Sequence, residues 1–299
     1  METPISSKKR LRIWLIAIAL ILIIVTAALA FICSPYFQTE PEVPVVHVPT
    51  GPTEPPTEAP TEEPTLPPPE ANPYDDLDFQ YDGRFLKLIE GESIAGIDVS
   101  SWQYDIDWEA VADAGAEFAM IRIGYRGSES GKINADKYAQ QNLTGAAEAG
   151  LDIGVYFFSQ ALTREEAEEE AYYVLEVIKD HNITMPVVFD WERIRGEDSR
   201  SNSMDRRTLT DCALTFLETI ELAGYNAMIY FNPHQSRNLL YLSELTDYDF
   251  WLASYTDRMN FPYKVKMWQY TESGTIPGID TPCDFNVYFP DGDELPHSN

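Results

Sequence analysis

Two acidic side chains end an apolar run in the stretch PVVFDWE, residues 186–192. The run predicts a buried β-strand, and side chains alternate along a strand, so Asp190 and Glu192 face the same way. Strand geometry places such a pair about 6–7 Å apart, where two carboxylates repel and one holds its proton to higher pH than usual. The pair can supply an acid and a base, or an acid and an electrostatic stabiliser, which suits hydrolysis of a glycosidic bond.

A second acidic strand strengthens this interpretation, because Asp-x-Glu alone also fits two solvated acids at a surface strand end. In AGIDVSSWQYDIDW, residues 95–108, Asp98 and Ser100 share the face opposite two branched apolar neighbours. In a closed barrel of strands, Asp98 would reach the same mouth as Asp190 and Glu192. The alternative is that Asp98 caps the turn that follows it.

The elements that must position these acids are short apolar runs alternating with amphipathic ones. The runs predict strands at residues 94–99, 118–124, 153–158, 186–192, 226–231, 249–254, 264–270 and 284–288. Thr163 to Glu166 form a capping-box pattern that opens an acidic helix, and a later apolar stripe that includes Cys212 ends at Gly224. Alternating strands and helices predict an α/β fold with a mainly parallel sheet. Eight strands in about 200 residues favour a compact, irregular TIM-like β/α barrel, with catalytic groups at the carboxyl ends of its strands.

The N-terminal third predicts an exported domain on a stalk. The 21 residues from Ile13 to Cys33 carry no charge and, as a helix, span about 30 Å of hydrocarbon. Cations before them favour a cytoplasmic N-terminus and an extracytoplasmic domain. Cleavage of a signal peptide near Ala30 is the alternative to this membrane anchor. The predicted organisation is a basic tail (1–12), a transmembrane helix (13–33), a Pro/Thr/Glu-rich linker (34–91), the barrel domain (92–290) and a C-terminal tail (291–299).

Composition narrows the partners. Of 299 residues, 49 are acidic and 21 are Lys or Arg, a net charge of −28, which argues against binding nucleic acid. Four scattered histidines form no metal-binding pattern, and neither a metal nor a cofactor is expected. Cys212 and Cys283 lie 71 residues apart and are expected to be separate thiols, although a disulfide between them stays open. The sequence leaves the oligomeric state undetermined.

Seven stretches occur in the order found in one enzyme family: GIDVSSWQYDIDW, FAMIRIGYRG, GVYFFSQA, PVVFDWE, AMIYFN, FWLASYT and KMWQYTESGTIPGIDTPCDFNVY. With them, residues 96–288 resemble the glycoside hydrolase family 25 lysozymes, or Chalaropsis-type muramidases. The resemblance implies cleavage of the β-1,4 bond between N-acetylmuramic acid and N-acetylglucosamine, with peptidoglycan glycan strands as the partner.

The same resemblance implies roles for the acids. Glu192 matches the general acid that protonates the leaving oxygen. Asp190 would stabilise the oxocarbenium-like state or orient the 2-acetamido group of the substrate, and Asp98 would hold this arrangement by charge and hydrogen bonding. Asp284, in CDFN, would support the site or cap a loop. Retaining and inverting stereochemistry both stay open, with retention preferred.

Aromatic residues near strand ends are candidates for sugar contacts, because a rigid ring covers the flat apolar face of a sugar at low entropic cost. These are Tyr125, Tyr156, Tyr230, Trp251 and Trp268, with Tyr156 and Trp251 preferred and core packing the alternative for each. The family often has a polar aromatic residue after GVY where this chain has Phe157 and Phe158, a departure that touches one groove contact but not the acids. Arg122 is expected to pair with an inward-facing carboxylate or to be purely structural.

Two other functions stay open. A wall-binding module would keep the groove without turnover, but the presence of Asp98, Asp190 and Glu192 together argues against it. A stalked adhesin or scaffold would have no reason to cluster carboxylates.

Overall fold

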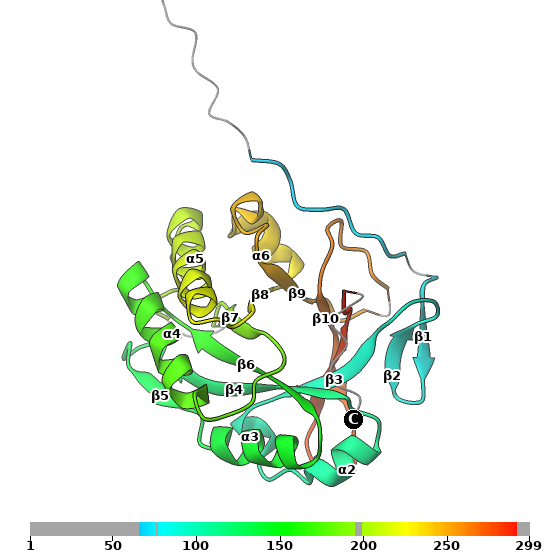
Figure 1. The fold of residues 1–299 in the computed structure, drawn as a ribbon. Coiled ribbons are helices and arrows are strands. Elements are labelled where there is room, and N and C mark those ends of the chain that lie inside the picture. Colours follow the sequence, from blue (N-terminus) through cyan, green and yellow to red (C-terminus); the bar gives the residue numbers. More distant parts are fainter. Residues whose placement is uncertain (1–65, 76, 195–198, 257, 292–299) are drawn as a thin grey trace, which may run out of the picture. The chain divides into compact units, whose positions relative to one another are not determined.

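The computed structural model describes residues 66–75, 77–194, 199–256 and 258–291. Eight of its strands close into a barrel, and each pairs with the next around the ring (Figure 1). In order around the barrel they are β3 (Ile94–Val99), β4 (Phe118–Arg126), β6 (Asp152–Ser159), β7 (Val187–Trp191), β8 (Ala227–Phe231), β9 (Asp249–Ala253), β10 (Met267–Gly274) and β11 (Cys283–Tyr288). Strand β11 is antiparallel to both of its neighbours, and the other pairs are parallel. The predicted strands and the irregular β/α barrel are confirmed.

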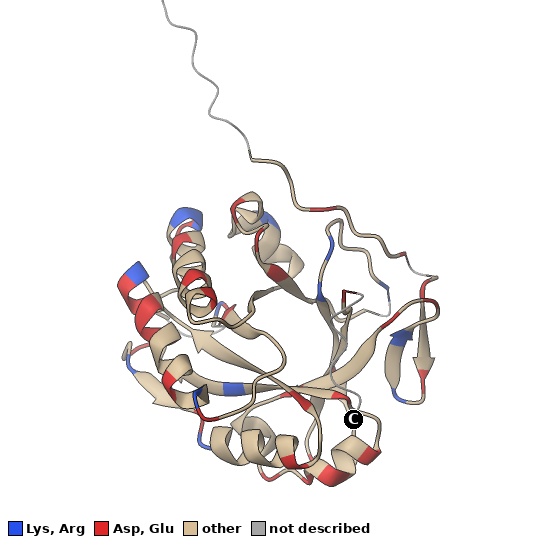
Figure 2. Cartoon of the chain, viewed as in Figure 1, with Lys and Arg blue, Asp and Glu red and all other residues tan. Residues whose placement is uncertain are grey.

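Helices cover the outside of the barrel (Figure 1). They are α2 (Trp108–Asp113), α3 (Ala139–Glu148), α4 (Arg164–Ile178), α5 (Arg206–Leu222) and α6 (Pro233–Asn238), and a short strand, β5 (Ile133–Ala135), joins the sheet beside β4. As predicted, Thr163 caps α4, and its side chain accepts a hydrogen bond from the Glu166 N–H. Acidic residues are spread over α4 and α5 (Figure 2).

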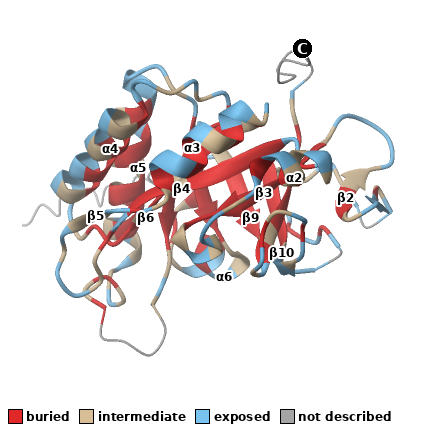
Figure 3. Cartoon of the chain, turned by 90° about the horizontal axis from the view of Figure 1, so that it is seen from below, coloured by how far each residue is buried: buried red, intermediate tan, exposed pale blue. Residues whose placement is uncertain are grey.

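Side-chain alternation divides the core into two parts. One cluster fills the barrel interior and includes Phe118, Met120, Val188, Met228 and Met267. A larger cluster packs between the strands and the helices, whose inner faces are buried (Figure 3). Along β4, β7 and β10 the inner residues are apolar first and polar later, as in Met267 followed by Gln269. The polar inner positions therefore gather at the carboxyl end of the barrel.

A hairpin that the sequence did not predict precedes the barrel. Strands β1 (Phe79–Asp82) and β2 (Phe85–Leu88) pair antiparallel within residues 34–91, which the sequence assigned to a linker. Phe85 is buried, with its ring centroid 4.9 Å from that of Phe285 on β11. The Leu86 N–H donates to the Tyr270 hydroxyl at 3.0 Å. The folded unit therefore begins before residue 92. The stretch was not predicted to fold because it is short and acidic and packs onto the barrel through only a few apolar side chains.

Two other expectations concern the N-terminal region and the thiols. In the described part of the chain, no helix has the length and apolar character needed to cross a membrane. The predicted span, residues 13–33, lies outside the described residues, as does Cys33. Cys212 and Cys283 are both buried and free, as separate thiols require.

The hairpin yields a stability prediction. Phe85→Ala should lower the free energy of unfolding by about 3 kcal/mol, because it leaves a cavity against Phe285. Ile89→Ala is the control: Ile89 follows the hairpin and is 51% exposed, so the change should stay within about 0.5 kcal/mol. Urea unfolding of the two variants measures the difference. Equal stabilities would mean that the hairpin is not part of the cooperative unit.

Candidate active site

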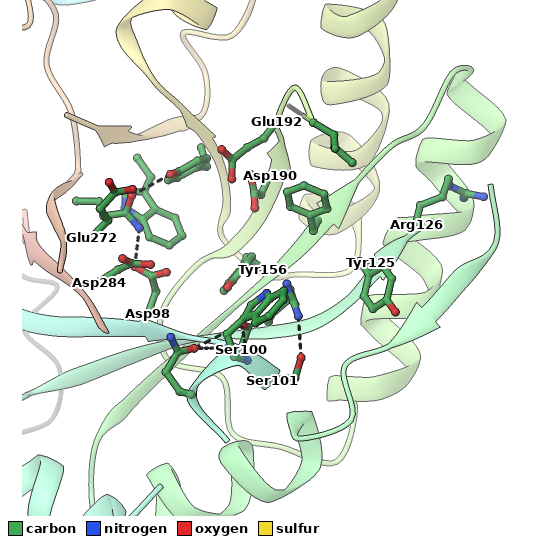
Figure 4. Close-up of a pocket in the computed structure, with 18 of the residues that line it drawn as sticks. Asp98, Ser100, Ser101, Tyr125, Arg126, Tyr156, Asp190, Glu192, Glu272 and Asp284 are labelled. Carbon is green, nitrogen blue, oxygen red and sulfur yellow. Dashed lines mark hydrogen bonds between the residues drawn. The ribbon is translucent and has the colours of Figure 1, made fainter. Parts of the chain in front are cut away.

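A cavity of about 770 Å³ opens at the carboxyl ends of the barrel strands. Its acidic lining residues are Asp98 from β3, Asp190 from β7, Glu192 immediately after β7, Glu272 from β10 and Asp284 from β11. Figure 4 shows these side chains around one space. The structure thus brings together all four acids that the sequence singled out, although they come from distant parts of the chain.

Two amide side chains fix Asp98, which is buried. Gln269 Nε2 donates to Asp98 Oδ2 at 2.7 Å, and Asn286 Nδ2 donates to the same oxygen at 2.8 Å. Both amides stand on inner positions of neighbouring strands. Hydrogen bonds from two neutral donors stabilise the ionised form of this carboxyl group without adding a cation.

Aromatic side chains orient these two amides. Gln269 Oε1 accepts from the hydroxyls of Tyr230 at 2.9 Å and Tyr255 at 3.1 Å. Asn286 Oδ1 accepts from Trp251 Nε1 at 2.9 Å. Because the oxygens of both amides are engaged, their N–H groups must face Asp98. Tyr230 and Trp251, predicted to contact sugar, do line the cavity, but their polar atoms serve this network.

Asp98 and Asp284 form a proton-sharing pair. They are directly opposite each other on β3 and β11, and their carboxyl groups are hydrogen-bonded. Burial, the charge of Asp98 and this hydrogen bond raise the pKa of Asp284 to about 9. Burial also raises the pKa of Asp98, opposed by its bonds from Asn286, Gln269 and Asp284. At neutral pH the proton therefore lies on Asp284, which donates to Asp98.

Asp190 and Glu192 differ in exposure. Asp190 is 5% exposed, whereas Glu192 is only half-buried. Burial first, and then the charges of Glu192 and Asp98, raise the pKa of Asp190 well above its usual value, while Arg122 acts in the opposite direction. Within the described residues, Asp190 Oδ1 is buried and has no hydrogen-bond partner. The sequence predicted that one acid of the pair would retain its proton, and burial favours Asp190 as that acid.

Arg122 pairs with a carboxylate, but not with one of these four. Its Nη2 lies 2.8 Å from Asp136 Oδ2, and it donates to Ser101 Oγ at 3.1 Å. Arg122 lines the cavity. Its charge therefore acts on Asp190 without forming a salt bridge to it.

The remaining predicted sugar contacts divide into two groups. Tyr125 and Tyr156 line the cavity, and Tyr156 packs edge-on against Trp251 with centroids 6.1 Å apart. The prediction for Trp268 is wrong: it is fully buried in the outer core, and its Nε1 donates to the Ser254 carbonyl. Because Gln269 faces the barrel interior, the preceding residue must face outward, and there the Trp268 ring packs against Phe79 of the hairpin, with centroids 5.3 Å apart.

Several residues that line the cavity were not predicted from the sequence. Gln269 and Asn286 could have been found from strand alternation, since Asn286 lies two residues after Asp284 on the same face. Trp102 and Tyr255 line the cavity and are 68% and 48% exposed, but they follow strand ends, where alternation no longer applies. Across the described ranges, no three His, Cys, Asp or Glu side chains are arranged to hold a metal ion.

Comparisons with known proteins agree with this geometry. Residues 97–279 match the family described as Glycosyl hydrolases family 25. The uncharacterized protein YegX of Escherichia coli (strain K12) is 28% identical over 211 residues, which cover 68% of this chain and 72% of YegX. The autolytic lysozyme of Clostridium acetobutylicum is 24% identical over 194 residues, covering 64% of this chain and 55% of the lysozyme.

One solved structure was determined with a ligand. The modular autolysin LytC from Streptococcus pneumoniae, in complex with a synthetic peptidoglycan ligand, superposes with a TM-score of 0.59 at 25% identity. The match covers 68% of this chain and 48% of LytC. The chain thus spans about half the length of LytC.

The Asp98–Asp284 pair predicts a pH-dependent stability. Asp284 has a folded-state pKa of about 9 against a usual value of 3.8, so the folded protein binds the extra proton between these values. This contribution to stability is complete below about pH 4 and is lost as pH rises towards 9. Asp284→Asn removes it, so from pH 5 to pH 8 the variant should gain on the order of 1–4 kcal/mol relative to wild type.

Urea unfolding at the two pH values measures this gain. The control is Asp113→Asn, at an exposed position at the end of α2, which should follow the wild-type pH dependence. If Asp284→Asn also follows the wild type, Asp284 does not hold a proton at neutral pH.

Proposed function

Because the chain belongs to glycosyl hydrolase family 25, and is therefore a glycoside hydrolase, we propose that it cleaves the β-1,4 bond between N-acetylmuramic acid and N-acetylglucosamine in peptidoglycan. The observation that carries the proposal is the convergence of Asp98, Asp190, Glu192 and Asp284 on one cavity at the barrel mouth. The likeness to an autolytic lysozyme and to an autolysin with a peptidoglycan ligand supports the substrate.

Glu192 is the proposed general acid. It is half-buried and lines the cavity, so a glycosidic oxygen can reach it, whereas Asp190 lies deeper. Burial favours a proton on Asp190 before a glycan binds. A bound glycan would exclude water from Glu192, which disfavours its ionised form. The proton of the pair would then lie on Glu192, which protonates the leaving oxygen.

Asp190 would then be ionised beside the reacting sugar. Its unpartnered Oδ1 can accept a hydrogen bond from the N–H of the 2-acetamido group, which orients that group for attack on the anomeric carbon. A carboxylate at this position also stabilises the positive charge of an oxocarbenium-like transition state.

Asp98 and Asp284 would complete the electrostatics. Asp98, ionised and held by Gln269 and Asn286, adds negative potential without moving during the reaction. Asp284 keeps its proton at neutral pH and so limits the repulsion among the clustered acids. Such preorganised charge contributes to catalysis because little reorganisation is needed when the transition state forms.

The decisive test uses purified peptidoglycan. Glu192→Gln should lower the rate of formation of new reducing ends at muramic acid by on the order of 10²–10⁴-fold, because the amide cannot supply the proton. Glu148→Gln, an exposed change on α3, is the control and should be as active as wild type. Mass spectrometry of the released fragments identifies the cleaved bond.

The other outcomes separate the alternative functions. Binding to peptidoglycan without any new ends would indicate a wall-binding module. A wild-type protein that neither binds nor cleaves peptidoglycan would indicate a scaffold. New ends at N-acetylglucosamine would show that the assigned bond is wrong.

We further propose that residues 13–33 anchor the protein in the cell membrane, with the barrel domain outside. The charge-free length of this segment and the cations before it support the anchor. The full-length protein should then sediment with membranes and be digested by protease added to spheroplasts. Full-length, uncleaved protein in the culture medium would contradict the anchor. Protein in the medium that has been cleaved near Ala30 would indicate a signal peptide.

A further inference from the structure

Three amide side chains hold the backbone of residues 191–194, the segment that carries Glu192. Their hydrogen bonds are Gln235 Nε2 to the Trp191 carbonyl at 2.5 Å, Gln160 Nε2 to the Glu192 carbonyl at 3.0 Å, and Asn202 to Ile194, accepting from its N–H at 3.0 Å and donating to its carbonyl at 2.9 Å. We call Gln160, Asn202 and Gln235 the amide clamp.

The amide clamp holds the backbone at a point where the strand is no longer hydrogen-bonded within the sheet. Strand β7 ends at Trp191, which is its last residue paired with β6, and its last pair with β8 is at Asp190. Glu192 therefore lies beyond the ladder of backbone hydrogen bonds that fixes the rest of the strand. The direction of its side chain depends on whatever else holds its backbone.

Gln160 is the most completely bonded member of the clamp. It is fully buried, and its Oε1 accepts from Ser199 Oγ at 2.6 Å and Ser201 Oγ at 2.5 Å. Its Nε2 donates to the carbonyls of Ser159 at 2.8 Å and Glu192 at 3.0 Å. Both N–H groups and both acceptor positions are used, and the amide cannot be flipped because carbonyls have no proton to donate.

We propose that Gln160 is a positioning residue for the general acid: by holding the Glu192 carbonyl to the end of β6, it sets the direction of the Glu192 side chain. This proposal rests on the proposed function, in which Glu192 is the acid. Gln160 is fully buried and is not among the residues that line the cavity, so its loss should affect turnover rather than binding.

Steady-state kinetics on solubilised peptidoglycan test this role. Gln160→Met keeps the side-chain length but removes every hydrogen bond of the amide. Its kcat should fall about 10- to 100-fold, the effect of displacing a catalytic group by about 1 Å, while KM changes less than about twofold. A smaller fall in kcat is expected for the double variant Ser199→Ala/Ser201→Ala. It removes both hydrogen bonds to the Gln160 amide oxygen but keeps the hydrogen bond from Gln160 Nε2 to the Glu192 carbonyl.

A third variant tests the hydrogen bond itself. Gln160→Glu can donate to the Glu192 carbonyl only while the new carboxyl group is protonated. Its kcat, divided by that of wild type at each pH, should therefore fall as pH rises through the pKa of this carboxyl group. A residue needed only for packing would give a ratio that does not depend on pH.

The matched control is Asn142→Leu. Asn142 on α3 is a fully buried amide whose side-chain atoms have no partner within the described residues, and its loss should leave kcat within about twofold of wild type. Thermal unfolding tests whether each variant is folded. If Gln160→Met is unfolded, the double variant Ser199→Ala/Ser201→Ala and the Gln160→Glu variant still test the proposal.

A wild-type kcat in Gln160→Met, or an equal loss in Asn142→Leu, would overturn the positioning role. If Glu192→Gln is inactive while Gln160→Met is fully active, only this inference fails. If Glu192→Gln is itself active, the proposed catalytic mechanism fails.

Discussion

The site depends on keeping several carboxyl groups close together at the mouth of a closed barrel, where burial and mutual repulsion oppose ionisation. The protein meets this constraint mainly with neutral groups. Asp284 holds a proton and donates to Asp98, and the amides of Gln269 and Asn286 stabilise the charge that remains. Arg122 lies nearby, but it is paired with Asp136. In the proposed reaction, the charge that remains on Asp98 would stabilise a positively charged transition state.

Strand alternation explains how the barrel supports such a site. Inner positions near the amino ends of the strands are apolar and fill the barrel, and the inner positions that follow are polar. Val188 and Asp190 on β7 illustrate the change within two residues. The apolar layer closes the barrel beneath the acids, so burial raises their pKa values. Packing and chemistry are thus set by the same alternation, and shifting one strand by one residue would remove both.

Alternation also explains how much could be predicted from the sequence. The eight strands and the shared direction of Asp98, Asp190 and Glu192 followed from apolar runs and residue parity. Trp268 was wrongly predicted to contact sugar because its aromatic side chain was given more weight than its position in the alternation of β10, which places it on the outer face. Which acid retains its proton could not be predicted, since this depends on burial: Asp190 and Glu192 differ in depth although they share a face. The hairpin at residues 79–88 was missed because its few apolar residues have a clear role only beside the barrel surface they cover.

The central claim is that the clustered acids hold protons unequally at neutral pH. Carbon-13 NMR of aspartate side-chain carboxyl groups, assigned with single Asp→Asn variants and followed from pH 4 to pH 10, measures this directly. Asp284 should titrate near pH 9, and Asp190 should also remain protonated well above the usual range of an aspartate. If both resonances instead titrate near pH 4, like those of exposed aspartates, the barrel mouth does not hold its acids in the way described.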